Sequence, residues 1–275
     1  MKRKLRIDMI GSGNVATHLA QALVRSGHEL VGIYSRTRSH AEELACRVGT
    51  LSACSQQPKA TDALEQLPSA EVYIFSVKDS VLAELAAQLA VVLPEGILRS
   101  SLFLHTAGCM SVDVLTPHFA QCAVVYPLQT FSKQAELDFS SVPLFVEGNH
   151  AEADERAMQL ACCLSKQVRR LDGEGRKRIH LAGVLANNFT NHFCALAYEW
   201  LESSGIDPQC LLPIIDETAR KLHTTLPRDA QTGPARRWDT NVMERHEAML
   251  AERPELQRLY EEISQSIHHY YTKQQ

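Results

Sequence analysis

The sequence lacks an excess of positive charge, a long apolar run and any repeat or low-complexity segment. Its 275 residues carry a formal net charge of −4, and the few basic clusters are short and scattered. This balance argues against nucleic acid as a partner. No apolar run approaches the roughly 20 residues of a membrane span, and Met1-Lys2-Arg3-Lys4 precedes a strand-like segment without an apolar signal core. We therefore expect a soluble, cytoplasmic protein with no membrane partner.

The spacings typical of disulfide frameworks and metal sites are also missing. No Cys-x-x-Cys pair occurs, and the expected state of the cysteines is reduced, with most of them packed as small hydrophobes. The eight positions are Cys46, Cys54, Cys109, Cys122, Cys162, Cys163, Cys194 and Cys210. Because the His and Cys residues show none of the close paired spacings of a zinc site, we expect no metal.

What the chain does contain is a regular alternation of short β-rich runs and helical patterns. This alternation predicts an α/β fold, with a Rossmann-type, mostly parallel sheet covered by helices. The expected strands are residues 5–10, 30–35, 50–53, 71–77, 101–106, 123–126, 142–147 and 167–171. After residue 172 the β signal ends, and the helical patterns are residues 176–203, 208–224, 242–251 and 255–271. We therefore expect a sheet domain over residues 1–172 and an all-α domain over residues 173–275.

A glycine-rich turn joins the first expected strand to a helix. Gly11 allows the tight turn, Gly13 lets the backbone approach a ligand, and the small Ala16 lets the helix pack closely on the strand. The helix N-terminus offers unpaired N–H groups and the positive end of its dipole to phosphates. The pattern predicts a dinucleotide cradle, with an ordinary turn as the alternative. The predicted contacts are Gly11, Ser12, Gly13, Asn14 and Val15.

The second expected strand has no acidic residue at its end. An NAD enzyme usually carries Asp or Glu there for the ribose hydroxyls, whereas an NADP enzyme carries arginine for the additional phosphate. This chain reads Ser35-Arg36-Thr37-Arg38, which supplies hydroxyl groups and two guanidinium groups. We therefore predict NADP(H) over NAD(H). The alternative is that the two arginines only solvate the surface.

Later turns supply further candidates, because ligands of open α/β sheets lie beyond the carboxyl ends of the strands. Ser76, Val77 and Lys78 follow the fourth expected strand, and Thr106 ends the fifth. We predict that these residues contact the cofactor. For Lys78 a simple helix start, with Asp79 as its cap, is the alternative.

The helix expected over residues 176–203 is the best place for an acid or base. His180, Asn187 and Asn191 recur at intervals of seven and four, so they share one face of an α-helix. An imidazole suits protonation of a carbonyl or imine, and the amides of Asn187, Asn188 and Asn191 can orient a substrate. Lys177 is a further catalytic candidate. A solvated polar face is the alternative.

The long connection at residues 224–240 is a third candidate region. It contains Thr232 and Arg236, and a loop of this kind can close over an anionic substrate whose carboxylate Arg236 binds. A plain connector, ended by Asp239 capping the next helix, is equally open.

Four short motifs together resemble a known family. They are His105-Thr106-Ala107-Gly108, Tyr126-Pro127-Leu128-Gln129-Thr130-Phe131, His180-Leu181-Ala182 with Asn188-Phe189, and Thr232-Gly233-Pro234 with Arg236 and Asp239. Their order is similar to that of the Rossmann-like/DUF2520 family of NADP oxidoreductases. This family is related to pyrroline-5-carboxylate reductase, the F420-dependent NADP oxidoreductases and the 6-phosphogluconate dehydrogenase-like β-hydroxyacid dehydrogenases.

The resemblance covers almost the whole chain, and it implies more than the residues alone. It implies that the turns after the fourth and fifth strands run beside the nicotinamide and its ribose, and that the helical domain forms a homodimer. Lys177 resembles in type the catalytic lysine of β-hydroxyacid dehydrogenases. The family commonly has histidine where this chain has Tyr126, and glycine where it has Arg237-Trp238. Both departures bear on the substrate pocket, so Tyr126 is also a substrate candidate.

The combined prediction is an NADP-dependent oxidoreductase. It transfers hydride between the nicotinamide and a small carbonyl or imine substrate held between the two domains. The alternative is an NADP(H)-binding sensor or scaffold without turnover, because a fold alone does not guarantee activity.

Overall fold

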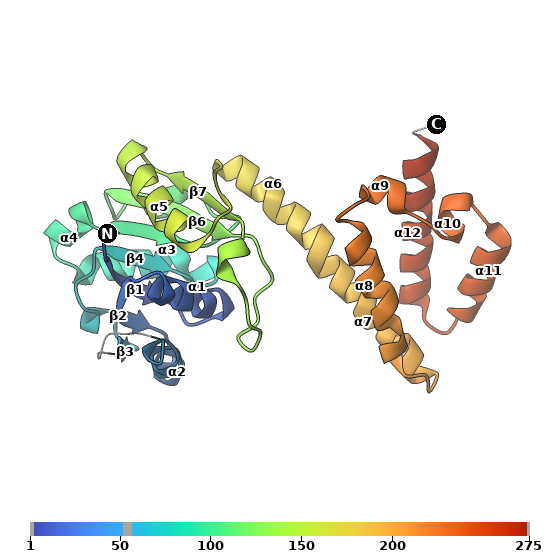
Figure 1. Ribbon diagram of the computed structural model, residues 1–275, viewed down its shortest axis with the longest axis horizontal. Coiled ribbons are helices and arrows are strands. Elements are labelled where there is room, and N and C mark those ends of the chain that lie inside the picture. The colour runs from blue at the N-terminus through green and yellow to red at the C-terminus, as the bar shows by residue number, and fades with distance from the viewer. Residues whose placement is uncertain (1–2, 52–56, 274–275) are drawn as a thin grey trace. The chain divides into compact units, whose positions relative to one another are not determined.

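The computed structural model describes residues 3–51 and 57–273 (Figure 1). By compactness the chain divides into two units, Met1–Asn188 and Phe189–Gln275. The last strand ends at Arg170 and the next helix begins at Gly173, on either side of the boundary expected after residue 172. The first compact unit ends 16 residues after that boundary, at Asn188. The roles expected for the two domains stay predictions.

The first unit is built on one eight-stranded sheet in the order β3-β2-β1-β4-β5-β6-β7-β8. Among the strands that the structure describes, only β6 and β7 pair antiparallel, and the other neighbours are parallel. The strands are β1 (Arg6–Ile10), β2 (Glu29–Tyr34), β3 (Lys59–Thr61), β4 (Val72–Phe75), β5 (Leu102–His105), β6 (Gln121–Pro127), β7 (Leu144–Gly148) and β8 (Val168–Arg170). The predicted α/β class with a mostly parallel Rossmann-type sheet is confirmed.

Helices cover both faces of this sheet (Figure 1). They are α1 (Asn14–Arg25), α2 (Arg38–Gly49), α3 (Asp79–Val92), α4 (Glu95–Ser100) and α5 (Ala151–Leu164), with short turns η1 (Leu64–Gln66), η2 (Val112–Val114) and η3 (Phe139–Ser141). Side chains of β1 alternate between the two faces: Ile7 and Met9 join the core under α1, α2 and α5, whereas Ile10 joins the core under α3. The carboxyl ends of the mutually parallel strands β1 to β6 lie at one edge of the sheet, whereas those of β7 and β8 lie at the opposite edge.

The strand expected at residues 50–53 is wrong at its two described residues, Thr50 and Leu51. Thr50 follows the end of α2, and the Leu51 N–H donates to the Val48 carbonyl, so this segment continues a helix end. Ser52, Ala53 and Cys54 lie outside the described residues. The third strand is instead β3, which pairs with β2 through only three residues. A run of three residues is too short to show the alternation by which a strand is recognised.

The single long helix expected over residues 176–203 is also wrong in detail. It consists of α6 (Gly173–Gly183), a π-helical turn η4 (Val184–Phe189) and α7 (Thr190–Ser203). A π turn closes hydrogen bonds over five residues instead of four and so changes the register of side chains along a helix. The seven-residue interval from His180 to Asn187 therefore does not correspond to two α-helical turns.

The second unit is helical throughout the part that the structure describes. It contains α7, η5 (Pro208–Leu211), α8 (Leu212–Lys221), α9 (Pro227–Ala230), α10 (Pro234–Arg237), α11 (Thr240–Met249) and α12 (Pro254–Thr272). The connection expected as a loop at residues 224–240 thus includes two short helices, each starting at a proline that is preorganised for that position. None of the helices in the described part of the chain is long and apolar enough to cross a bilayer.

Candidate functional site

A cleft of about 590 Å³ opens at the carboxyl edge of the sheet, where the strand order reverses between β1 and β4. This switch point is where open α/β sheets bind their ligands. The cleft brings together most of the predicted residues: Gly11, Ser12, Gly13, Asn14, Val15, Ser35, Arg36, Thr37, Ser76, Val77, Lys78, Thr106, Tyr126 and His180.

The turn after β1 has no room for a side chain at its first glycine. Gly11 has φ +121°, and a Cβ there would lie 2.2 Å from the Ser76 carbonyl oxygen. At Gly13, in contrast, a Cβ would meet nothing within 4 Å. No side chain caps the N-terminus of α1, and its first turn carries no acid. The free N–H groups and the positive end of the helix dipole therefore face the cleft, as a phosphate-binding turn requires.

The end of β2 presents hydroxyl groups and one guanidinium to the same cleft. The Ser12 hydroxyl donates to the Ser35 hydroxyl at 2.9 Å, and Arg36 and Thr37 line the cleft beside them. Arg38 does not line it, because its side chain is exposed and forms an ion pair with Glu42 at 3.0 Å.

His40 also lines the cleft, and the sequence argument missed it. Its N–H donates to the Thr37 carbonyl at 3.0 Å in the first turn of α2. The signal that could have found it is its position, because a residue three places after Thr37 lies on the same side of a helix.

The turns after β4 and β5 are joined by their hydroxyl groups. Thr106 Oγ1 donates to Ser76 Oγ at 3.3 Å, and both residues are buried. Lys78 precedes the first residue of α3 without making a capping hydrogen bond, and both Lys78 and Asp79 line the cleft. Lys78 thus has the position of a helix start and still faces the cleft.

Tyr126 and His180 form a hydrogen-bonded pair in the wall of the cleft. The Tyr126 Oη lies 3.0 Å from His180 Nδ1, and the two rings meet edge to face. Burial raises the pKa of Tyr126 to about 12, and the nearby Cys109 adds to this rise. The phenol is therefore neutral near pH 7 and can donate its proton to Nδ1, which leaves the hydrogen of a neutral imidazole on Nε2.

Gly108 makes this pair possible. A Cβ at Gly108 would lie 2.7 Å from His180 Nδ1 and 2.9 Å from Tyr126 Cε2. Any larger residue would push the two rings apart, so a glycine is required beside them.

A buried ion pair fastens the start of α6 to the sheet. Arg176, only 1% exposed, pairs with Glu147 of β7 and donates to the Met110 carbonyl at 2.6 Å. The Gly173 N–H also donates to Glu147, at 3.2 Å. Because Arg176 lies one helical turn before His180, these contacts set where the imidazole meets Tyr126.

His105 is a structural histidine at the end of β5. Burial is the main cause that lowers its pKa to about 4, although the hydrogen bond to Ser111 opposes this shift. The neutral ring accepts from the Ala107 N–H at 3.2 Å and donates to the Ser111 carbonyl at 3.2 Å. It thereby holds the loop that carries Gly108.

Helices α1 and α2 hold the loop after β6, which forms another wall of the cleft. Asn14 donates to the Phe131 carbonyl at 2.8 Å, His18 Nε2 lies 2.7 Å from the Ser132 carbonyl, and Arg47 donates to the Lys133 carbonyl at 2.7 Å. Phe131 itself lines the cleft. The Asn14 side chain thus helps to position this wall, with one of its two amide hydrogens.

Three predicted catalytic residues of the first unit lie outside the lining of this cleft. Lys177 is exposed and pairs with Glu174 at 2.8 Å, a contact that raises the pKa of Lys177. Asn187 and Asn188 are exposed in the π-helical turn. The change of register in that turn is the physical reason that they do not follow His180 along one face.

The other three predicted residues belong to the second unit. Asn191 is exposed on α7, and Thr232 precedes α10. The Arg236 guanidinium stacks 4.2 Å from the centre of the Tyr271 ring, which holds α10 against α12. Their roles in catalysis and substrate binding stay predictions.

Titratable side chains elsewhere do not assemble into a metal centre. Within residues 3–51 and 57–273, no three His, Cys, Asp or Glu side chains are grouped as a metal ion would need. The seven cysteines in these ranges carry free thiols. Cys54 lies outside them.

Comparisons with known proteins agree with the fold. A model described as "NADP oxidoreductase coenzyme F420-dependent" matches residues 6–100, and a domain of unknown function, DUF2520, matches residues 142–267. No curated protein matches the chain. A solved "putative NADP oxidoreductase" from Bacteroides fragilis is 43% identical, with 97% of this chain and 98% of that chain covered and a TM-score of 0.88.

Two more distant structures share the fold. A Thermotoga maritima protein is 20% identical with a TM-score of 0.70, and 98% of this chain and 99% of that chain are covered. Pyrroline carboxylate reductase of Plasmodium falciparum, solved with NADP bound, is 9% identical with a TM-score of 0.57. The match covers 96% of this chain and 98% of that chain. Because it is 43% identical to the Bacteroides protein over almost its whole length, this chain belongs to the NADP oxidoreductase family that carries a DUF2520 segment. This agrees with the resemblance of its motifs.

Proposed function

We propose that this protein transfers hydride between NADP(H) and a small carbonyl or imine substrate that lies beside His180. One observation carries the proposal: a single cleft contains an uncapped helix N-terminus at the glycine turn and the Tyr126–His180 pair. The first feature suits a dinucleotide pyrophosphate, and the second suits proton exchange with a substrate.

The residues of the cleft fit the phosphorylated dinucleotide. The backbone N–H groups of residues 12–15 would hold the pyrophosphate. Arg36, with the hydroxyl groups of Ser35 and Thr37, would hold the 2′-phosphate, and no acid stands in this segment to repel it. Ser76, Lys78 and Thr106 would line the path toward the nicotinamide. When bound, this cofactor exchanges a hydride with the carbon of the substrate's C=O or C=N group.

The chain's own part is to orient the substrate and to manage one proton. Tyr126 would donate to His180 Nδ1, which would leave Nε2 to give a proton to, or take it from, the substrate's oxygen or nitrogen. Arg176 and Glu147 act as positioning residues because they hold the helix that carries His180.

A panel of keto acids, cyclic imines and aldehydes tests this function. With NADPH present, the loss of its absorbance should identify at least one substrate, while calorimetry reports cofactor binding. Binding without turnover on every member of the panel would favour the alternative of a sensor or scaffold.

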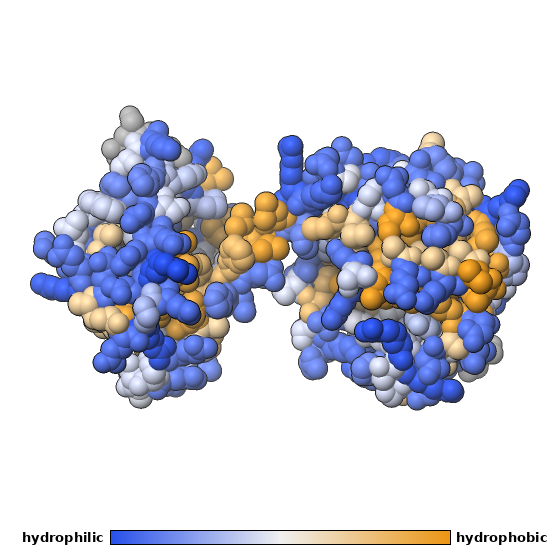
Figure 2. Space-filling view, turned by 180° about the vertical axis from the view of Figure 1, so that it is seen from behind, coloured by the Kyte–Doolittle hydropathy of each residue, from blue (hydrophilic) through white to orange (hydrophobic). Residues whose placement is uncertain are grey.

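We also infer that the second unit pairs with a second copy of itself. In its described part only Ala235, Met243, Leu250 and Ser264 are buried, whereas Ile214 and Met249 are 64% and 62% exposed. A helical unit with so small a core needs more apolar contact than it makes alone. Apolar side chains also gather over the helical segment around η4 (Figure 2). Phe189 of the second unit is more than half exposed there, as are Leu181 and Leu185 of the first unit.

Light scattering across the micromolar range tests this dimer. We expect twice the chain mass, and a constant monomer mass would contradict the inference. The cytoplasmic location expected from the sequence stays a prediction.

A further inference from the structure

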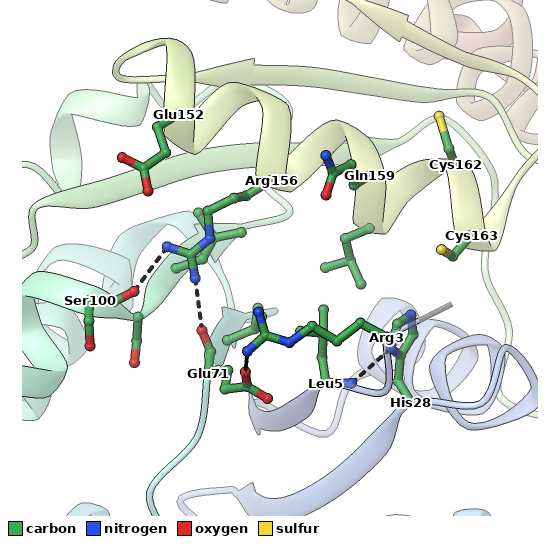
Figure 3. A pocket seen from close by; sticks show the side chains of 14 residues that line it. Arg3, Leu5, His28, Glu71, Ser100, Glu152, Arg156, Gln159, Cys162 and Cys163 are labelled. Carbon is green, nitrogen blue, oxygen red and sulfur yellow. Dashed lines mark hydrogen bonds and ion pairs between the residues drawn. The ribbon is translucent and has the colours of Figure 1, made fainter. Parts of the chain in front are cut away.

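A second cavity, of about 820 Å³, lies at the opposite, amino edge of the sheet (Figure 3). It is bordered by α5 and by the starts of β1, β4 and β5, and it shares no lining residue with the cleft described above. Its apolar lining residues are Leu5, Val72, Leu102 and Leu160. A cavity of this size, lined by apolar side chains and a few polar groups, has the composition of a small-molecule site.

Two oppositely charged side chains line this cavity without forming an ion pair with each other. Glu152 and Arg156 are one turn apart on α5, in the order that favours an ion pair along a helix. Arg156 instead donates to two backbone carbonyls, of Ser100 at 2.9 Å and of Glu71 at 3.5 Å (Figure 3). Among the described residues neither Glu152 nor Arg156 has an oppositely charged partner within 4.0 Å.

The neighbouring charges are already paired. Arg3 forms an ion pair with the Glu71 carboxylate (Figure 3). The uncompensated groups are thus one guanidinium, held in place by neutral carbonyls with further N–H groups to spare, and one carboxylate a helical turn away.

We propose that this cavity binds a zwitterionic α-amino acid with a large apolar side chain. The ligand's carboxylate would take the free N–H groups of Arg156, and its ammonium group would meet Glu152. The ligand's apolar side chain would pack against Leu102 and Leu160. A guanidinium that is fixed before binding loses little freedom when the ligand arrives, which favours affinity.

Calorimetry on the full chain with the cofactor cleft filled by NADPH tests the ligand class. L-Phenylalanine should give a saturable heat that is the same without NADPH. The analogues 3-phenylpropionate and 2-phenylethylamine, which lack the ammonium and the carboxylate, should each bind about tenfold or more weakly, since each loses one charge-assisted contact. Equal binding of all three compounds, or no saturable heat up to on the order of 10 mM phenylalanine or leucine, would overturn the proposal.

Variants of α5 locate the binding. Arg156→Gln and Glu152→Gln should each weaken phenylalanine binding about tenfold or more. Glu155→Gln is the matched control, because Glu155 lies on the same helix, pairs with Arg170 at 3.0 Å and does not line the cavity.

Arg156→Gln removes the bonds to two carbonyls and can therefore perturb folding, whereas Glu152 is exposed. Unchanged binding in Glu152→Gln would by itself overturn the assignment.

Discussion

The Tyr126 hydroxyl lies 3.0 Å from His180 Nδ1, although the two residues are 54 positions apart in the chain. The sheet supplies the tyrosine from the end of β6, and the first helix after the sheet supplies the histidine. Each holds the other in the wall of the cleft that we assign to NADP(H).

Removal of the imidazole should abolish proton exchange and leave the cofactor in place. His180→Ala is expected to lower kcat by about 10²- to 10⁴-fold, the usual contribution of a general acid or base. Tyr126→Phe keeps the imidazole and should lower kcat less, because only the group that orients His180 is lost.

The internal control for both variants is the Kd of NADPH, which should stay within about twofold of the wild-type value. Loss of a contact worth about 1.4 kcal/mol of binding free energy would instead raise this Kd tenfold. Full turnover in His180→Ala would remove this residue from the mechanism.

Gly108→Ala should disturb the pair without unfolding the protein. The added methyl group would lie 2.7 Å from His180 Nδ1 and 2.9 Å from a Tyr126 ring carbon, so the rings must separate. We expect a loss of kcat close to that of Tyr126→Phe, with a Tm near that of wild type. Gly96→Ala is the matched control: it lies in α4, a Cβ there meets nothing within 4 Å, and alanine should raise stability by about 1 kcal/mol. Equal kcat in both variants would show that the space at Gly108 is not needed.

The two arginines after β2 should differ in their effect on cofactor choice. Arg36 lines the cleft, whereas Arg38 pairs with Glu42. Arg36→Ala should weaken NADPH binding by about tenfold or more and leave NADH binding nearly unchanged, because only the former carries the 2′-phosphate. Arg38→Ala should change the ratio of the two affinities little. Calorimetric titration of both cofactors checks this, and an unaltered ratio in Arg36→Ala would refute the assignment.

A buried carboxyl group should make stability depend on pH. Asp8 is fully buried in β1, and within the described residues its side chain has no hydrogen-bond partner. Burial raises its pKa from 3.8 to about 8, with Arg6 opposing the shift. Between these two values the folded state holds a proton that the unfolded state has lost. The free energy of unfolding should therefore fall as pH rises through this window, by up to about 1.4 kcal/mol per pH unit.

Asp8→Asn keeps the shape and removes the charge. Urea unfolding at about pH 5 and pH 8 should show the variant gaining stability over wild type as pH rises, because it lacks this titration. A constant difference between the two proteins would show that Asp8 does not titrate in this window.

Features formed by residues that are neighbours in the sequence could be predicted from it. The glycine turn, the arginine after β2 and the alternation of strands and helices are contiguous patterns, and the sheet class and the cradle could be predicted from them. The pairing of Arg176 with Glu147 joins residues 29 positions apart, and that of Tyr126 with His180 joins residues 54 apart. No local pattern reports such contacts. The intervals of seven and four residues between His180, Asn187 and Asn191 do not predict a shared face, because helical periodicity assumes α-helical turns and the π-helical turn breaks it.

The most direct test is calorimetric titration of the purified wild-type protein with NADPH, followed by the same titration with NADH. We predict saturable binding of one NADPH per chain and clearly weaker binding of NADH. If NADPH gave no heat and no protection against thermal unfolding, the assignment of the cleft and the proposed chemistry at His180 would both be contradicted.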